Sequence, residues 1–207
     1  MSDEDKRGLL TRRQVVGGCA AAGALLVFGG AARALEPQEG RLRPPGAQDE
    51  QRLWASCIRC DRCRVACPTG AIGVGKMSAG VLNGRLPEMD FRSGWCDMCG
   101  GEYRCAAACP TGAIGMFDDT RDKIGVAVVD ENVCQLFGVS AHCSAPCIGA
   151  CAYGALSLDA YGRLEVDEDR CNGCGACEAV CPSNSYGNYQ ATGGRGINVR
   201  AWEGGRA

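Results

Sequence analysis

Cys57-Ile58-Arg59-Cys60-Asp61-Arg62-Cys63-Arg64-Val65-Ala66-Cys67-Pro68 places four cysteines at the spacing C-x2-C-x2-C-x3-C-P. The two-residue gaps let a tight loop bring three thiols to one side of a bound group. The fourth thiol follows a helical turn later and points away from the first three. The proline then ends the short helix and returns the chain to an extended conformation. Chance rarely produces this spacing, and the chain repeats it.

Three more groups of four cysteines follow the first. The second group has a five-residue gap in its middle, the third has an eight-residue gap and no proline after its last cysteine, and the fourth matches the first. The last cysteines of the first three groups are 42 residues apart each time, which indicates duplication of one structural unit. The groups, called repeats one to four, are Cys57, Cys60, Cys63, Cys67; Cys96, Cys99, Cys105, Cys109; Cys134, Cys143, Cys147, Cys151; and Cys171, Cys174, Cys177, Cys181.

This spacing is typical of cysteines that hold [4Fe-4S] clusters, where three thiolates bind one cluster and the fourth binds a second. We therefore predict four [4Fe-4S] clusters, with these sixteen cysteines as the iron ligands. The composition agrees, because 17 cysteines accompany an aromatic content of only 6%. A conventional core would be thin, and bound clusters would add their binding free energy to folding.

Disulfides and structural zinc are the alternatives. An exported cysteine-rich chain is usually a disulfide scaffold, and zinc sites usually pair two CxxC knuckles across a long spacer. The clustering into fours and the proline after three of the four repeats favour iron–sulfur clusters over both. His142, the only histidine, lies beside Cys143; we expect it to be solvated or hydrogen-bonded, because four cysteines are already present there.

Residues 1–34 resemble a twin-arginine signal peptide. Arg12 and Arg13 precede an apolar run rich in glycine and alanine, and Ala32-Arg33-Ala34 fits a cleavage site. A membrane-spanning helix, or an uncleaved signal that acts as an anchor, is the alternative. The twin-arginine route exports folded proteins, which suits a chain whose clusters are inserted in the cytoplasm, so we expect a periplasmic location.

The remaining chain divides into three parts. Residues 35–51 are expected to form a mobile Pro/Gly-rich linker, residues 52–186 the four-cluster domain, and residues 187–207 a Gly-rich C-terminal tail draped over that domain, with a short strand at 197–199. Without residues 1–34 the chain carries 17 basic and 21 acidic residues.

Between the cysteine groups lie strand signals rather than long helices. Residues 155–158 and 163–166 are predicted to form one β-hairpin, and residues 114–117 and 124–129 another. Hairpins that flank short cysteine-bearing helices predict an α+β fold made of duplicated bacterial-ferredoxin-like modules around four iron–sulfur clusters.

No substrate site is evident in the sequence. It lacks a C-x-x-C-H haem motif, a G-x-G-x-x-G motif after a strand and a P-loop, and its acidic balance argues against nucleic acid. The sequence therefore predicts an electron carrier rather than an enzyme, with other proteins as donor and acceptor and no small-molecule substrate.

The order of leader, proline-rich link, two C-P repeats, a loose third repeat and a regular fourth resembles the MauM/NapG family of ferredoxin-type proteins. The resemblance implies a periplasmic electron carrier that works with a membrane-bound ferredoxin-type or quinol-oxidising protein and with a periplasmic cytochrome or reductase. It implies methylamine utilisation or periplasmic nitrate reduction as the pathway. The missing proline after Cys151 departs from the regular repeat.

Which repeats share clusters is open in the sequence. The short link between Cys151 and Cys171 favours tandem pairing, of repeat one with two and three with four. Resemblance to the four-cluster subunits of molybdenum oxidoreductases favours nested pairing, of one with four and two with three. We prefer nested pairing, which gives the ligand sets Cys57, Cys60, Cys63, Cys181; Cys171, Cys174, Cys177, Cys67; Cys96, Cys99, Cys105, Cys151; and Cys134, Cys143, Cys147, Cys109.

Two other functions fit the same cysteines. One is an iron–sulfur β subunit bound permanently to a molybdenum catalytic chain, which would co-purify with a large partner. The other is a cluster-bearing sensor or maturation factor, whose clusters would not cycle during turnover.

Overall fold

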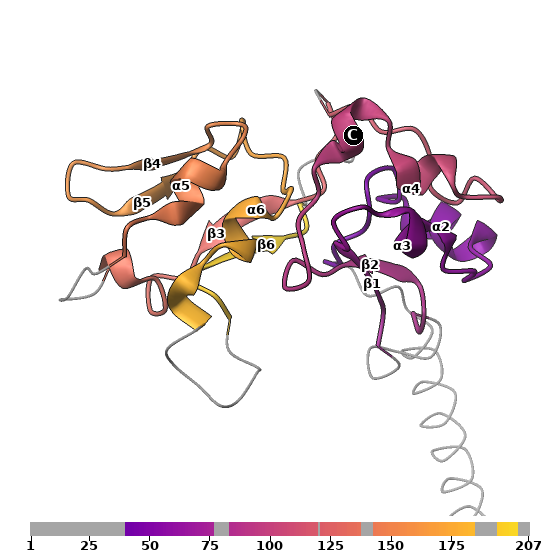
Figure 1. Ribbon diagram of the computed structural model, residues 1–207, viewed down its shortest axis with the longest axis horizontal. Coiled ribbons are helices and arrows are strands. Elements are labelled where there is room, and N and C mark those ends of the chain that lie inside the picture. Colours follow the sequence, from indigo (N-terminus) through magenta and orange to yellow (C-terminus); the bar gives the residue numbers. More distant parts are fainter. Residues whose placement is uncertain (1–39, 77–82, 120, 138–142, 185–193, 203–207) are drawn as a thin grey trace, which may run out of the picture.

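The computed structural model describes residues 40–76, 83–119, 121–137, 143–184 and 194–202, which form two lobes side by side (Figure 1). The predicted signal peptide, residues 1–34, lies outside these ranges. Within them, no helix has the length and apolar character needed to span a membrane.

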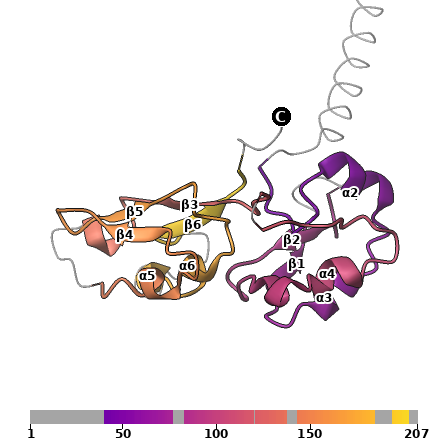
Figure 2. The same ribbon diagram turned by 90° about the horizontal axis from the view of Figure 1, so that it is seen from above.

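The first lobe contains short helices and one two-stranded antiparallel sheet (Figure 2). In the sheet, Ile72 pairs with Met89 and Val74 with Pro87. The cysteine-bearing helices α3 and α4 pack against each other. The elements of this lobe are α2 (Glu50–Ser56), α3 (Arg62–Ala66), β1 (Ile72–Val74), β2 (Pro87–Met89), the 3-10 helix η3 (Met98–Gly101) and α4 (Arg104–Ala107).

The second lobe has two two-stranded antiparallel sheets, in which β3 pairs with β6 and β4 with β5. Two cysteine-bearing helices, α5 and α6, pack against each other here. The elements are β3 (Val126–Val129), η4 (Gln135–Phe137), α5 (Pro146–Ala150), β4 (Leu156–Leu158), β5 (Leu164–Val166), α6 (Ala176–Ala179), η5 (Pro182–Asn184) and β6 (Ile197–Arg200). The described residues thus form a small α+β structure.

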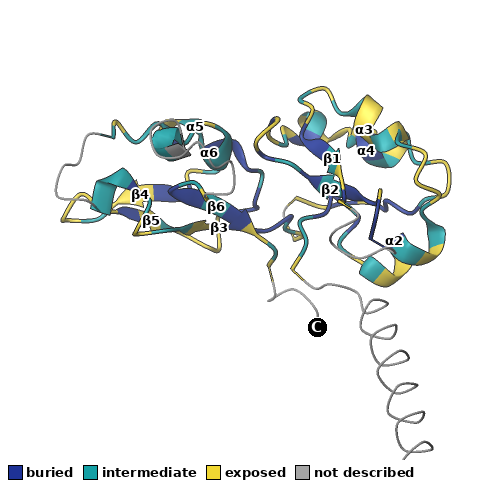
Figure 3. Ribbon diagram, turned by 90° about the horizontal axis from the view of Figure 1, so that it is seen from below, coloured by how far each residue is buried: buried dark blue, intermediate teal, exposed yellow. Residues whose placement is uncertain are grey.

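Buried residues lie in both lobes (Figure 3). They form two apolar cores, and cysteines contribute to both. Leu53, Leu86 and Phe91 are buried in the first core, and Leu156 and Ile197 in the second. Cysteines form a larger share of the second core, where Cys147, Cys171 and Cys177 are buried, than of the first, where Cys105 is the one buried cysteine.

One of the two predicted hairpins is confirmed and the other is wrong. The predicted hairpin at 155–166 is the pair β4 and β5. Residues 114–117 form no strand, and β3 instead pairs with β6, so that Val129 faces Ile197. The reason is a long-range contact: the Gly115 N–H donates a 2.7 Å hydrogen bond to the Gly46 carbonyl. The backbone of residues 114–117 therefore bonds to the segment that precedes α2 and not to a neighbouring strand.

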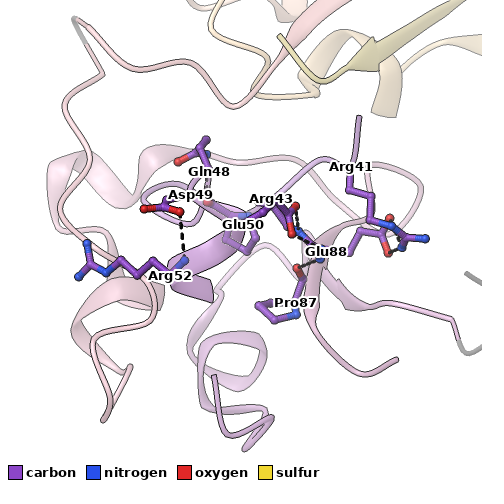
Figure 4. A network of polar contacts seen from close by, with 9 residues as sticks. Arg41, Arg43, Gln48, Asp49, Glu50, Arg52, Pro87 and Glu88 are labelled. Carbon is purple, nitrogen blue, oxygen red and sulfur yellow. Dashed lines mark hydrogen bonds and ion pairs between the residues drawn. The ribbon is translucent and has the colours of Figure 1, made fainter. Parts of the chain in front are cut away.

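The segment preceding α2 is packed into the first lobe and is not the mobile linker expected from its composition. Arg43, Pro44 and Pro45 are fully or almost fully buried. The Arg43 guanidinium donates to both carboxylate oxygens of Glu50, at 2.6 and 2.9 Å, and to the Pro87 carbonyl at 3.0 Å (Figure 4). These contacts fix the segment against α2 and β2.

The C-terminal strand is also part of the folded protein. The predicted strand at 197–199 exists as β6, and Ile197 is 1% exposed in the second core. The Glu178 carboxylate on α6 accepts a 2.7 Å hydrogen bond from the Val199 N–H. Residues 194–202 therefore form part of the second lobe, where the sequence had predicted a tail draped over the domain.

Candidate metal centres

Each short cysteine-bearing helix begins at a residue in the left-handed region. Asp61, Tyr103, Ala145 and Gly175 cap α3, α4, α5 and α6 with φ values of 60°, 43°, 52° and 80°. Each lies two positions before the third cysteine of its repeat. A positive φ is uncommon for residues other than glycine and tends to mark functional sites. The same turn therefore places the third thiol in all four repeats.

The first set of thiols, site 1, surrounds a pocket in the first lobe. Cys57, Cys60 and Cys63 line this pocket from repeat one, and Cys109 lines it from repeat two. The pocket encloses about 440 Å³ of space, including its open mouth, and Ala113 and Ile114 line its apolar wall.

Site 4, in the second lobe, likewise combines three thiols of one repeat with the fourth thiol of another. Its pocket of about 320 Å³ is lined by Cys171, Cys174 and Cys177 of repeat four and by Cys151 of repeat three. The Ala127 N–H points at the Cys171 sulfur at 3.4 Å, and the Ala155 N–H at the Cys151 sulfur at 3.3 Å. Such bonds stabilise negative charge on thiolate sulfur.

Site 2 brings together Cys96, Cys99 and Cys105 with Cys67 from repeat one. Burial raises the pKa of Cys96 to about 12, and the neighbouring thiolates of Cys105 and Cys67 raise it further. Burial likewise raises the pKa of Cys105 to about 11, again with Cys99 and Cys67 as close neighbours. The fourth thiol of repeat one thus joins repeat two.

Site 3 brings together Cys134, Cys143 and Cys147 with Cys181 from repeat four. Burial raises the pKa of Cys147 to about 11, and the nearby thiolates of Cys181, Cys143 and Cys134 add to the effect. The loose third repeat therefore gathers its thiols in the same way as the other repeats.

The four sites show tandem pairing of the repeats. Repeat one shares its fourth thiol with repeat two, and repeat three with repeat four, so the nested pairing preferred from the resemblance to molybdenum subunits is wrong for this chain. The ligand sets that place Cys181 with Cys57 and Cys109 with Cys134 are wrong for the same reason. Helices from successive repeats pack directly, α3 on α4 and α5 on α6.

The sites follow one another in the spatial order 1–2–4–3. Cys63 of site 1 lies near Cys105 of site 2. Between the lobes, the Cys96 N–H of site 2 donates a 2.8 Å hydrogen bond to the Cys174 carbonyl of site 4. Cys147 of site 3 and Cys177 of site 4 share the core of the second lobe.

Hydroxyl groups beside the fourth cysteines are site residues that the sequence reasoning missed. The Thr69, Thr111 and Ser183 hydroxyls lie 3.5, 3.7 and 3.6 Å from the sulfurs of Cys67, Cys109 and Cys181. Each is two residues after its cysteine, a regularity that is visible in the sequence.

The Thr111 hydroxyl also affects the acidity of its cysteine. Burial alone would raise the pKa of Cys109, but hydrogen bonds from the Thr111 hydroxyl and from the N–H groups of Ile114, Thr111 and Ala113 together outweigh it, so the pKa is lowered. These groups therefore favour the thiolate form at this position.

The thiols fit a group that carries positive iron. All sixteen described cysteines are free of disulfides, and burial raises the pKa of several, including Cys63 to about 11. A buried thiolate is unfavourable without a compensating cation, which iron supplies. No three His, Cys, Asp or Glu side chains among the described residues meet closely enough to hold one metal ion. His142 lies outside the described residues.

Comparisons with known families agree with this geometry. A model described as "4Fe-4S dicluster domain" matches residues 56–114, which contain repeats one and two, and one described as "4Fe-4S binding domain" matches residues 163–191. Fold, thiol sites and family matches define a ferredoxin-type iron–sulfur electron carrier.

Similar proteins show to which family of ferredoxin-type proteins the chain belongs. The chain is 33% identical to the methylamine utilization ferredoxin-type protein MauM of Paracoccus denitrificans, over 84% of each chain. It is 35% identical to MauM of Methylophilus methylotrophus, over 82% of this chain and 79% of that one. It is 33% identical to the ferredoxin-type protein NapG of Escherichia coli, over 68% of this chain and 66%, just under two thirds, of NapG. The chain belongs to the MauM/NapG family of ferredoxin-type proteins.

Proposed function

We propose that this protein relays electrons between other redox proteins through four [4Fe-4S] clusters. The observation that carries the proposal is the gathering of sixteen free thiols into four sets of four, two sets in each lobe. The ligands are Cys57, Cys60, Cys63, Cys109 for site 1; Cys96, Cys99, Cys105, Cys67 for site 2; Cys134, Cys143, Cys147, Cys181 for site 3; and Cys171, Cys174, Cys177, Cys151 for site 4.

The chain's own residues set the conditions at each site. Bound [4Fe-4S] clusters supply reversible one-electron chemistry at potentials set by hydrogen bonds and solvent exposure. Backbone N–H groups such as that of Ala127 point at sulfur, and five of the sixteen described cysteines are buried. The order 1–2–4–3 gives a continuous path with sites 1 and 3 at its ends.

The two-lobed arrangement supports duplication of a two-cluster ferredoxin-like module. In each lobe two cysteine-bearing helices pack together, α3 with α4 and α5 with α6. The fourth cysteine of each repeat lies in the site of the other repeat of the same lobe. The equal 42-residue spacing of Cys67, Cys109 and Cys151 points the same way.

A periplasmic role is supported by the signal-like residues 1–34 and by the family. We propose export of the folded protein by the twin-arginine route, a membrane-bound ferredoxin-type or quinol-oxidising protein as one partner, and a periplasmic cytochrome or reductase as the other. The MauM relatives are named for methylamine utilization. Replacing Arg12 and Arg13 by lysine should leave folded protein in the cytoplasm, and unchanged export would contradict the leader assignment.

Metal analysis tests the cluster content. Anaerobically purified protein should contain about sixteen irons and as many acid-labile sulfides per chain, as four cubes require, and dithionite should produce an EPR signal. Cys19→Ser, which changes the one cysteine outside the four repeats, is the control and should keep all sixteen irons. Colourless protein without an EPR signal after reconstitution would contradict the proposal.

A further inference from the structure

Site 1 contains the most exposed thiol-bearing residue among the described cysteines. Cys60 is exposed, whereas each of the other fifteen described cysteines is buried or half-buried. Two apolar side chains beside it, Ile58 and Val74, are 64% and 43% exposed and line the same pocket. Val65, on α3, is 80% exposed. Exposed aliphatic groups at the edge of a redox site are the kind of surface that a partner protein covers.

Four arginines surround this apolar opening. Arg59, Arg62, Arg64 and Arg85 all line the site 1 pocket and are all exposed. The single acidic residue of the lining, Asp61, lies 2.7 Å from the Arg85 guanidinium and 3.9 Å from that of Arg64. Apart from the thiols, the charged side chains of the described lining, four arginines and one aspartate, therefore sum to +3.

Site 4 shows that holding a cluster does not require these arginines. Its pocket has the same four-thiol composition and the same C-x2-C-x2-C spacing, yet no charged side chain appears among the described residues that line it. The arginines of site 1 are therefore a feature of this end of the molecule. Site 1 is also terminal in the order 1–2–4–3, where electrons must enter or leave.

We propose that the site 1 face, defined as Ile58, Cys60, Val74 and the four arginines around them, is the docking surface for a redox protein with an acidic surface. The proposal rests on the proposed function and names the partner chemistry for one end of the relay. The apolar centre supplies contact area, and the arginine rim steers the acidic partner and orients it. An electron then crosses at the exposed thiol of Cys60.

A flavodoxin, a one-electron carrier with an acidic surface, serves as the probe, and a basic c-type cytochrome serves as the opposite probe. The dithionite-reduced holoprotein is mixed with each oxidised probe over a range of ionic strengths. The rate constant with flavodoxin should fall as salt increases. Arg62→Glu should lower it about tenfold at low salt, a typical size for lost electrostatic steering. Flavodoxin binding, measured by optical titration, should weaken in parallel.

Arg121→Glu is the matched control, because Arg121 is an exposed arginine outside the site 1 pocket and the substitution makes the same charge change. It should keep both the rate and the affinity. Arg64→Glu is a second variant should Arg62→Glu fail to fold, and should also slow the reaction. Equal effects of Arg62→Glu and Arg121→Glu on the flavodoxin rate would overturn the proposal. So would a wild-type rate that is higher with the basic cytochrome than with flavodoxin and that Arg62→Glu abolishes.

Two further results separate this proposal from its alternatives. Binding to anionic phospholipid vesicles that Arg62→Glu removes, with no effect on flavodoxin, would make the face a membrane contact and overturn the proposal. Wild-type protein with sixteen irons and a salt-independent rate would overturn the docking surface alone. Wild-type protein without clusters would overturn the proposed function, and this proposal with it.

Discussion

The backbone N–H of Cys96 donates a 2.8 Å hydrogen bond to the carbonyl of Cys174. This bond joins a thiol-bearing loop of the first lobe to one of the second, and so connects sites 2 and 4. Beside it, a Cβ on Gly175 would lie 2.1 Å from the Phe91 ring, so the two lobes approach each other closely at this point. Continuity between the four sites depends on this junction.

Substituting Gly175→Ala is expected to separate the lobes. The new methyl group meets the Phe91 ring, and Gly175 has a φ of +80°, which an L side chain tolerates poorly. Gly162→Ala is the control, because Gly162 has a φ of +77° but no neighbour within 4 Å of its Cβ position.

The collision with Phe91 should cost about 1–3 kcal/mol beyond the control. Anaerobic urea unfolding, followed by bleaching of the visible absorbance, should show a lower midpoint for Gly175→Ala than for Gly162→Ala. EPR spin coupling between sites 2 and 4 should weaken in the first variant alone. Equal midpoints would mean that the junction is loose.

Removing the Thr111 hydroxyl should make the potential of site 1 more negative. The hydroxyl lies 3.7 Å from the Cys109 sulfur and favours its thiolate. Thr111→Val loses this donor. The reduced cluster carries one more negative charge than the oxidised cluster, so losing the donor destabilises the reduced state more and lowers the potential. About 1 kcal/mol for a hydrogen bond corresponds to about 40 mV for a one-electron couple. An EPR redox titration measures the shift, and Thr111→Ser should restore it; a shift in the positive direction would contradict the assignment.

Tandem pairing makes a prediction about single thiols. Cys181→Ala should remove a ligand of site 3, because Cys181 lies with Cys134, Cys143 and Cys147. About four irons should be lost per chain, and the EPR features of site 1 should persist. Loss of the site 1 signal would indicate nested pairing instead. Cys109→Ala is the reciprocal variant and should affect site 1.

The buried ion pair of Arg43 and Glu50 should be important for stability. Arg43 is 2% exposed and binds both carboxylate oxygens of Glu50. Arg43→Ala leaves that carboxylate without its partner, which typically costs about 3–5 kcal/mol. Arg41→Ala, which removes the more open Arg41–Glu88 pair at 3.1 Å, should cost about 1 kcal/mol or less. Anaerobic urea unfolding measures the loss of unfolding free energy in the two variants. Similar losses would mean that the Arg43–Glu50 pair contributes no more to stability than the Arg41–Glu88 pair.

The local structure of the cysteine loops was predictable in part. The spacing of repeat one indicated a loop, a short helix and a break at Pro68, and α3 occupies Arg62–Ala66. The left-handed caps were not predictable, because Asp61, Tyr103 and Ala145 have no shared side-chain chemistry. Closing the loop around the thiols imposes their backbone conformation, whichever residue is present.

Long-range pairing is where the sequence reasoning failed. Strands at 124–129 and 197–199 were both predicted, but not that β3 pairs with β6, which lies about 70 residues further along the chain. Local periodicity shows that a strand has a buried face but does not say which strand covers it. The same limit applies to residues 41–50, whose prolines suggested a linker and whose burial depends on contacts with α2 and β2.

The amino-acid sequence by itself determined the chemistry: four groups of four thiols, their spacing and their family membership follow from which residues are present and how far apart they are. The tertiary structure decided which thiols meet, the order 1–2–4–3 and the arginine-rimmed opening at site 1. The physical reason is that ligand type and loop length are local properties, whereas the partner of each fourth cysteine depends on how α3 packs on α4 and α5 on α6. That packing depends on residues far apart in the sequence, which come together only in the folded cores of the two lobes.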